Sequence, residues 1–194
     1  YKRQGFICDY NSGKKGPILA VRCDMDGLLI SEQSNKDYKS VNQGVMHACG
    51  HDAHVAILMG VAEYLAKNKS QLKGKVMFIF QPAEENEGGG RAMIEEGLFE
   101  KYPVESVYGM HNWPGMPVGT FAIKPGPLMA AFDVFNVKII GKGGHAAMPQ
   151  TTVDPIIIGT KVIDAYQSIV SRYVDPQEPV VLSVTQFHGG DAYN

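Results

Sequence analysis

The sequence predicts an α/β protein with a largely parallel sheet, followed by a smaller second domain. Three observations carry this prediction. Short apolar runs bounded by glycine or proline alternate with segments of helical periodicity, the pattern of a layered α/β fold. Polar side chains follow at the ends of several of these runs. A Pro125-Gly126-Pro127 break then separates two differently organised parts of the chain.

Four apolar runs in the first part predict strands. The clearest are ILAVRC and KVMFIF, which are too short for helices and are rich in residues that favour strands. In chain order, the predicted strands are residues 18–23, 75–80, 104–110 and 119–124.

Two segments between these strands predict helices. Residues 51–68 place Val55, Leu58, Ala62 and Leu65 on one helical face, which is typical of an amphipathic helix. Residues 91–98 predict a shorter helix after a Gly88-Gly89-Gly90 run that is interpreted as a flexible turn. The polar residues 31–43 predict a loop.

The second part predicts a βαβ-like unit. Residues 131–140 and 180–187 are strand-like, and residues 154–173 have helical periodicity. We therefore expect one domain over residues 1–128 and the first part of another over residues 129–194.

Charge and composition exclude several partners. A formal charge of −2 provides no basic field for nucleic acid, and no apolar run approaches the ~20 residues that span a membrane. Cys8, Cys23 and Cys49 form no CxxC pair, which favours a reducing compartment, so we expect a cytoplasmic protein. The chain opens at Tyr1 and stops just after a strand-like run, so we expect truncation at both ends.

Three groups of potential metal ligands lie near predicted strand ends. They are HACGHDAH (residues 47–54), QPAEE (residues 81–85) and MHN (residues 110–112). Because ligands of open α/β sheets bind outside the carboxyl ends of strands, we expect these groups to converge. Imidazole, thiolate and carboxylate groups together are typical ligands of zinc and similar divalent cations.

The residue types within these groups favour hydrolysis. Cys49 and His51 are two residues apart on a non-helical turn, so both can face one site. Adjacent Glu84 and Glu85 can divide the work, one binding metal and the other acting as a general base towards an activated water. Taken singly, a histidine at a helix start is more often a surface or capping residue, and a Glu-Glu pair is more often solvated.

These motifs, in this order, resemble the M20 metallopeptidase family. The resemblance extends to DMD at residues 24–26, to the glycines that follow QPAEE, and to GGHAAMP at residues 143–149. It is greatest for the amidohydrolase branch, which includes N-acyl-amino-acid deacetylases, hippurate hydrolases and auxin-conjugate hydrolases.

The resemblance implies a catalytic α/β domain that holds two divalent metal ions, with zinc, manganese, nickel or cobalt all acceptable. It also implies an inserted lid domain that usually makes a homodimer. Each role is carried over residue by residue: Cys49, His51, Glu85 and His111 as metal ligands, Cys49 bridging or flanking the ions, Glu84 as general base, Asp26 as a carboxylate that orients nearby groups, and His145 of the lid as a stabiliser of the oxyanion.

Two departures from the family pattern stand out. The first motif continues as Gly27-Leu28-Leu29 where the family has Ala-Leu-Pro, which predicts a loop change with little chemical effect. The family's last metal ligand, a later histidine, has no counterpart here, so we expect this chain alone to be inactive.

The sequence thus predicts a metal-dependent amidohydrolase acting on small N-acyl amino acids or similar conjugates. A non-catalytic metal-binding relative, or an aminopeptidase or dipeptidase of the same fold, remains an alternative. A structural zinc protein is disfavoured because such sites use three or four Cys or His ligands without a spare glutamate.

Overall fold

A computed structural model describes residues 4–193. The chain divides into two compact units, one ending at Phe121 and the other beginning at Ala122. Each unit is described by itself.

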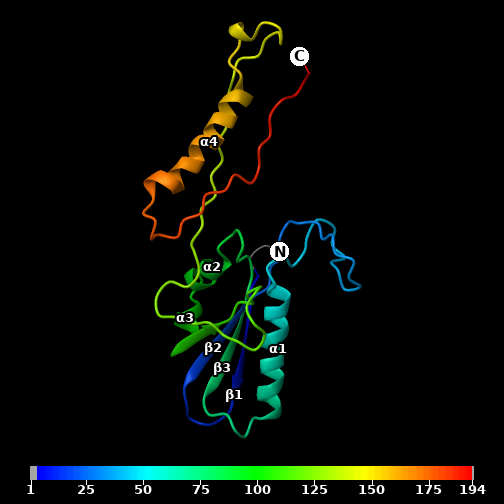
Figure 1. The fold of residues 1–194 in the computed structure, drawn as a ribbon. Coiled ribbons are helices and arrows are strands. Elements are labelled where there is room, and N and C mark those ends of the chain that lie inside the picture. The colour runs from blue at the N-terminus through cyan, green and yellow to red at the C-terminus, as the bar shows by residue number, and fades with distance from the viewer. Residues whose placement is uncertain (1–3, 194) are drawn as a thin grey trace. The chain divides into compact units, whose positions relative to one another are not determined.

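A four-stranded sheet forms the middle of the first unit (Figure 1). Its strands are β1 (Phe6–Asn11), β2 (Ile18–Asp24), β3 (Lys75–Gln81) and β4 (Ser106–Gly109), in the order β1-β3-β2-β4. Both β3 and β4 run parallel to β2, whereas β1 pairs antiparallel with β3. The largely parallel sheet was predicted correctly, but β1 was missed because its polar residues lie on a mostly exposed edge strand.

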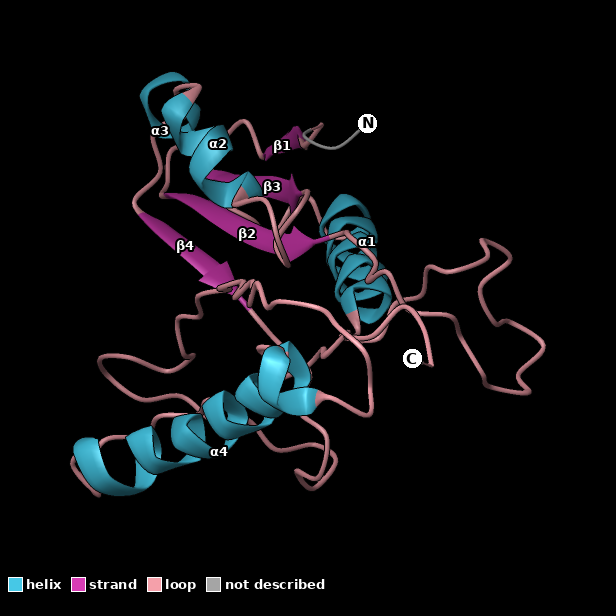
Figure 2. Ribbon diagram, turned by 90° about the horizontal axis from the view of Figure 1, so that it is seen from above, coloured by secondary structure: helices cyan, strands magenta, loops and turns pink. Residues whose placement is uncertain are grey.

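Helices cover both faces of this sheet (Figure 2). Helix α1 (His51–Lys67) lies on one face, and α2 (Gly89–Glu95) and α3 (Leu98–Lys101) lie on the other. The predicted helix at residues 91–98 is thus two short helices that begin earlier and end later.

The buried strand β3 joins the two layers of the core. Its side chains alternate, so Val76, Phe78 and Phe80 pack with Leu58 of α1, whereas Met77 and Ile79 pack with Leu98 of α3. Burial on both faces explains the continuous apolar run KVMFIF.

This topology brings the predicted ligand segments to one edge of the sheet. Parallel strands β2, β3 and β4 end on the same side, and α1 begins there because it connects β2 to its parallel neighbour β3. The segments that follow β2, β3 and β4 therefore meet the first turn of α1.

The second unit contains the predicted helix, α4 (Pro155–Tyr173), preceded by a 3₁₀ turn, η1 (Pro149–Thr151). Asp154 caps α4 by accepting hydrogen bonds from the N–H groups of Ile156 and Ile157. Among the described residues, no helix is long and apolar enough to cross a membrane.

Three predicted strands are wrong. Residues 119–124, 131–140 and 180–187 form no strand and no ladder with any described residue. Apolar alternation shows that a segment suits a sheet, but a strand also needs a hydrogen-bonding neighbour, and the described part of the chain provides none here.

Candidate metal centre

His51, the first residue of α1, lies at the centre of the candidate site. Its side chain is only 1% exposed. Nδ1 donates a hydrogen bond to the Asp26 carbonyl oxygen (3.0 Å), which fixes the ring so that Nε2 points the other way. Nε2 lies 3.7 Å from Glu85 Oε1 and 3.9 Å from Glu84 Oε2. A backbone acceptor on one ring nitrogen with the other nitrogen free is the usual arrangement of a metal-binding histidine.

Cys49 and His111 form a second pair beside His51. The Cys49 Sγ lies 3.3 Å from His111 Nε2, although 62 residues separate the two along the chain. His111 follows β4, and its Nδ1 donates to the Asn112 carbonyl oxygen (2.7 Å). His111 is therefore oriented in the same way as His51, with Nε2 directed towards the thiol.

The turn after β3 directs both glutamates into the site. Ala83 has a φ of +50°, a left-handed conformation that costs a non-glycine residue roughly 1–2 kcal/mol. Gly89 closes the turn: its N–H donates to Ala83 O (2.9 Å), and a Cβ placed on it would lie 1.8 Å from Pro82 O. The glycine run is only partly the predicted turn, because Gly89 and Gly90 already belong to helix α2.

Asp26 connects the turn to His51. Its Oδ2 accepts a hydrogen bond from the backbone N–H of Glu85 (3.0 Å), and its Oδ1 lies 3.3 Å from His51 Nδ1. The carboxylate therefore contacts two of the predicted ligands at once. This position agrees with an orienting role.

The hydrogen-bonding pattern of these residues fits a bound cation. Among the described residues, four buried side-chain atoms lack any hydrogen-bond partner. Three of them are in this cluster: Asp26 Oδ1, His51 Nε2 and Glu85 Oε1. Buried polar atoms are seldom left unpaired, because their desolvation is then uncompensated. A divalent cation held by His51 Nε2 and Glu85 Oε1, which lie 3.7 Å apart, would satisfy two of these atoms.

Two ligand triads share His51. The donor atoms of Cys49, His51 and His111 all lie within 4.8 Å of one another, and the same is true of His51, Glu84 and Glu85. The structure thus brings together all five residues that the motifs singled out around α1, β3 and β4. Mixed sulfur, nitrogen and oxygen donors gathered in this way are suited to divalent cations.

Burial and nearby carboxylates raise the pKa of the Cys49 thiol to about 11. Desolvation is the largest cause, followed by a hydrogen bond to Glu85 and the negative charges of Glu85, Glu84 and Asp24. Without a cation, Cys49 is therefore a protonated thiol. A cation would have to displace that proton in order to bind sulfur.

Three residues near the site were not predicted as functional: Asp24, His54 and Asn112. His54 Nδ1 donates to Asp24 Oδ1 (2.6 Å), and its Nε2 accepts from the Asn112 backbone N–H (3.0 Å). Burial alone would raise the pKa of Asp24, but the His54 hydrogen bond and the Arg22 charge outweigh it and hold that pKa below its ordinary value. All three residues stand inside the quoted motifs, next to predicted ligands, so motif position was the available signal.

His145 belongs to the second unit. It is exposed, and its Nδ1 accepts a hydrogen bond from the Ala147 N–H (3.1 Å). Its approach to the metal ligands stays a prediction.

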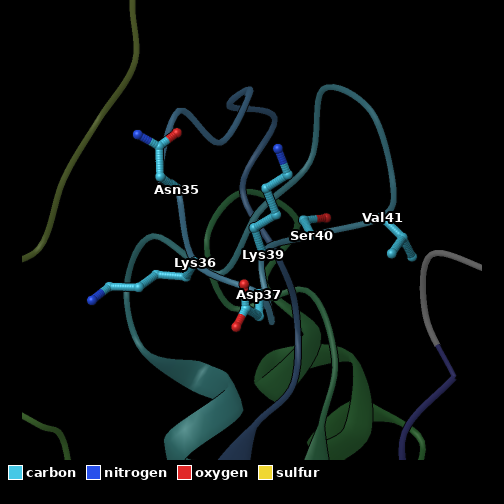
Figure 3. Close-up of a pocket in the computed structure, with 6 residues that line it drawn as sticks. All are labelled: Asn35, Lys36, Asp37, Lys39, Ser40 and Val41. Carbon is cyan, nitrogen blue, oxygen red and sulfur yellow. The ribbon is translucent and has the colours of Figure 1, made fainter.

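A concavity of about 640 Å³ lies elsewhere, in the loop between β2 and α1 (Figure 3). It is lined by residues of one segment only, Asn35, Lys36, Asp37, Lys39, Ser40 and Val41. Glu32 holds this loop by accepting from the Ser40 N–H (2.7 Å). None of the predicted ligands lines the hollow, so we interpret it as a loop bend separate from the metal centre.

The chain is similar to several known proteins. N-acetylcysteine deacetylase of Bacillus subtilis is 43% identical over 99% of this chain and 50% of its own length. N-acyl-L-amino acid amidohydrolase of Geobacillus stearothermophilus is 48% identical over 92% of this chain and 48% of its own. The crystal structure of a Bacillus subtilis dinuclear metal-binding peptidase from the M20 family matches with a TM-score of 0.62 and 39% identity, covering 84% of this chain and 43% of that one.

This chain spans about half the length of the curated relatives that it matches. The pattern of peptidase family M20/M25/M40 matches residues 20–192, nearly the whole chain. The resemblance suggested by the motifs is confirmed: the chain belongs to peptidase family M20/M25/M40, and within it to the amidohydrolase branch.

Proposed function

We propose that the whole protein is a metal-dependent amidohydrolase that cleaves the amide bond of N-acyl amino acids or similar small conjugates. The observation that carries this proposal is the cluster of three unpaired buried atoms on Asp26, His51 and Glu85, with Glu84 beside them. A cluster of this kind provides cation ligands and a free base at one place, which are the requirements of metal-assisted hydrolysis.

Cys49, His51, Glu85 and His111 are the proposed ligands. The Nε2 atoms of His51 and His111 and a Glu85 oxygen would hold the cations. The Cys49 sulfur, with several lone pairs, would bridge or flank them. Zinc, manganese, nickel and cobalt all accept this donor set. The similar Bacillus subtilis protein is a dinuclear metal-binding peptidase, which supports a pair of cations.

Glu84 and Glu85 differ in exposure, which supports different roles. The Glu84 side chain is 40% exposed and that of Glu85 only 19%. Glu85 is also held through its backbone N–H by Asp26, as expected of a fixed ligand. Glu84, the freer carboxylate, can meet water and substrate.

The reaction follows from these positions. Divalent cations held by these residues would polarise the amide carbonyl and lower the pKa of a nearby water towards ~7. Glu84 takes a proton from that water as the water oxygen attacks the carbonyl carbon. Glu84 then delivers the proton to the amide nitrogen as the C–N bond breaks, releasing a carboxylic acid and an amino acid.

The second unit supplies the remaining proposed parts. We propose that residues 129–194 begin a lid domain in which His145 stabilises the oxyanion formed during attack. We also propose that this domain makes a homodimer. Exposed apolar side chains on and around α4, among them Ile157 (58% exposed), support an apolar contact there. Light scattering combined with size-exclusion chromatography tests this, since a monomer at all concentrations contradicts it.

Glu84→Gln tests the proposed chemistry. The amide retains the shape of the side chain but cannot accept a proton, so turnover of N-acetyl amino acids should fall by about 10²–10⁴-fold. Cation content should stay unchanged, because the four proposed ligands remain. Glu95→Gln, an exposed glutamate of α2, is the matched control and should leave turnover as it is. Normal turnover by Glu84→Gln would overturn the assignment of the base.

A further inference from the structure

Behind the proposed ligands runs a chain of polar side chains that the catalytic proposal does not use. Arg22 Nη1 donates to Asp24 Oδ2 (2.8 Å), and Asp24 Oδ1 accepts from His54 Nδ1 (2.6 Å). The opposite ring nitrogen of His54 accepts from the Asn112 backbone N–H (3.0 Å), and the Asn112 side-chain oxygen lies 2.7 Å from it. Asp24 is 1% exposed and His54 4%.

These bonds occupy the atoms that would otherwise offer a further cation site. Asp24, His51 and His54 place donor atoms within 4.8 Å of one another. However, both oxygens of Asp24 and both ring nitrogens of His54 already have partners, unlike the free Nε2 of His51. The hydrogen bonds of these side chains are thus satisfied within the protein, which suits them to position their neighbours.

Each member of the chain belongs to a different ligand-bearing segment. Asp24 ends β2, two residues before Asp26. His54 lies one turn after His51 on α1, and Asn112 directly follows His111. The His54 ring also packs against the His111 ring with centroids 4.7 Å apart at 70°. One buried imidazole therefore joins three segments that are distant in sequence.

Asn112 acts on the ligands from two sides. Its carbonyl oxygen accepts the hydrogen bond that orients His111 (2.7 Å). Its side-chain oxygen lies 2.4 Å from the point where a Cβ of Gly50 would sit, so the amide fills the space beside the peptide between Cys49 and His51. Gly50 itself has a φ of +95°, which only glycine adopts readily. The amide thus supports the turn that presents both ligands.

We propose that Asp24, His54 and Asn112 are a positioning network that holds the Cys49–His51 turn against His111 before any cation binds. This inference rests on the proposed metal centre. Hydrogen-bonded partners of metal ligands typically contribute about 10–100-fold to cation affinity by fixing ligand orientation. The network here reaches Cys49 and His51 through the Asn112 side chain, and His111 through the Asn112 carbonyl oxygen and the His54 ring.

Asn112→Ala is the direct test, because the side chain is exposed enough for its loss to leave folding intact. Co²⁺ affinity, measured by chelator competition, should fall about 10–100-fold. The thiolate-to-Co²⁺ absorption band should shift or weaken, since Cys49 loses its fixed orientation. The melting temperature of the cation-free protein should stay close to that of the wild type.

Ser12→Ala is the matched control. Ser12 is 8% exposed and donates to Gly74 O (2.8 Å) next to the start of β3, the opposite edge of the sheet. This variant also loses a side-chain polar contact, but its Co²⁺ affinity should be unchanged. Equal weakening in Ser12→Ala and Asn112→Ala would mean a general loss of stability and would overturn the network.

His54→Gln provides a second, independent variant. One glutamine amide cannot reproduce both ring contacts, so Co²⁺ affinity should fall in the same direction. His54 and Asn112 belong to the same hydrogen-bond network. The fold-loss of Co²⁺ affinity in the double variant should therefore be much smaller than the product of the two single fold-losses. Full multiplicative loss would overturn the inference.

The outcomes separate this inference from the proposed function. A wild-type protein that binds no Co²⁺ would overturn the metal centre and the network together. Wild-type binding with equal affinity and an equal spectrum in Asn112→Ala would overturn the network alone.

Discussion

The pH dependence of cation binding tests whether Cys49 is a ligand. In the cation-free protein, burial and then the neighbouring Glu85, Glu84 and Asp24 raise the pKa of its thiol from 9.0 to about 11. Only the thiolate binds metal, so a cation must displace the proton. Without these surroundings the same thiol would ionise far more readily. The raised pKa therefore extends to higher pH the range over which a cation must displace a proton to bind Cys49.

The size of this dependence follows from the pKa. At pH 7 the thiol lies about four units below its midpoint, and at about 1.4 kcal/mol per unit its deprotonation costs roughly 5 kcal/mol. The cation–sulfur bond must exceed that cost. The pKa of about 11 lies above pH 9, so Co²⁺ must displace one proton at every pH from about 7 to about 9. Apparent Co²⁺ affinity should therefore rise about tenfold per pH unit over this range.

Isothermal titration at several pH values, in buffers of different ionisation enthalpy, measures both the slope and the proton released. Cys49→Ser should remove most of the slope, since a serine hydroxyl does not ionise in this range. Cys8→Ser is the matched control, because Cys8 is an exposed free thiol on β1 and should leave the slope unchanged. An equal slope in wild type and Cys49→Ser would refute the reasoning.

Three further predictions concern the framework of the site. Gly89→Ala should cost about 1–3 kcal/mol or more and reduce cation binding, because the new Cβ would overlap a carbonyl oxygen 1.8 Å away. Gly60→Ala, where the Cβ meets nothing within 4 Å on α1, should instead stabilise by about 0.5–1 kcal/mol; urea denaturation measures both. Leu58→Ala should cost about 2–5 kcal/mol because Leu58 is 2% exposed, whereas Met59→Ala, at 61% exposed, should change stability by less than about 0.5 kcal/mol in the same assay. The pKa of Asp24 is lower in the folded protein than its ordinary value of 3.8, so the carboxylate stabilises the fold above pH 3.8. This stabilisation is lost as the pH falls through the lowered pKa of the folded state. Acid titration followed by circular dichroism should show this loss, and Asp24→Asn should flatten it; an unchanged acid profile would contradict the assignment.

Local patterns in the sequence were sufficient for much of the first unit. The predicted strand at residues 18–23 and helix at residues 51–68 agree with β2 and α1 to within a residue at each end. Both segments have strong apolar patterns because they face a buried core. By contrast, β1 has an exposed face with Asp9 and Asn11, and its pairing with β3 depends on residues about 70 positions away. A pattern read along the chain cannot show such pairing.

The same reasoning explains the wrong strands in the second unit. Residues 131–140 and 180–187 have the apolar alternation of strands, but no described neighbour pairs with them. Helix α4 was predicted because a helix forms its hydrogen bonds locally and because Asp154 and Pro155 mark its start.

The convergence of Cys49, His51, Glu84, Glu85 and His111 could be predicted because strand ends in a parallel sheet share one edge. The left-handed conformation of Ala83 and the Asp24–His54–Asn112 chain could not, since both depend on contacts between distant segments. Motifs therefore indicated which residues gather, whereas their orientation required the structure.

Anomalous X-ray diffraction from crystals of the protein loaded with Mn²⁺ or Zn²⁺ tests the central claim most directly. The account predicts two cation peaks per chain, together contacted by Cys49 Sγ, the Nε2 atoms of His51 and His111, and a Glu85 oxygen. Peaks located away from these atoms, or no peak beside His51, would contradict it.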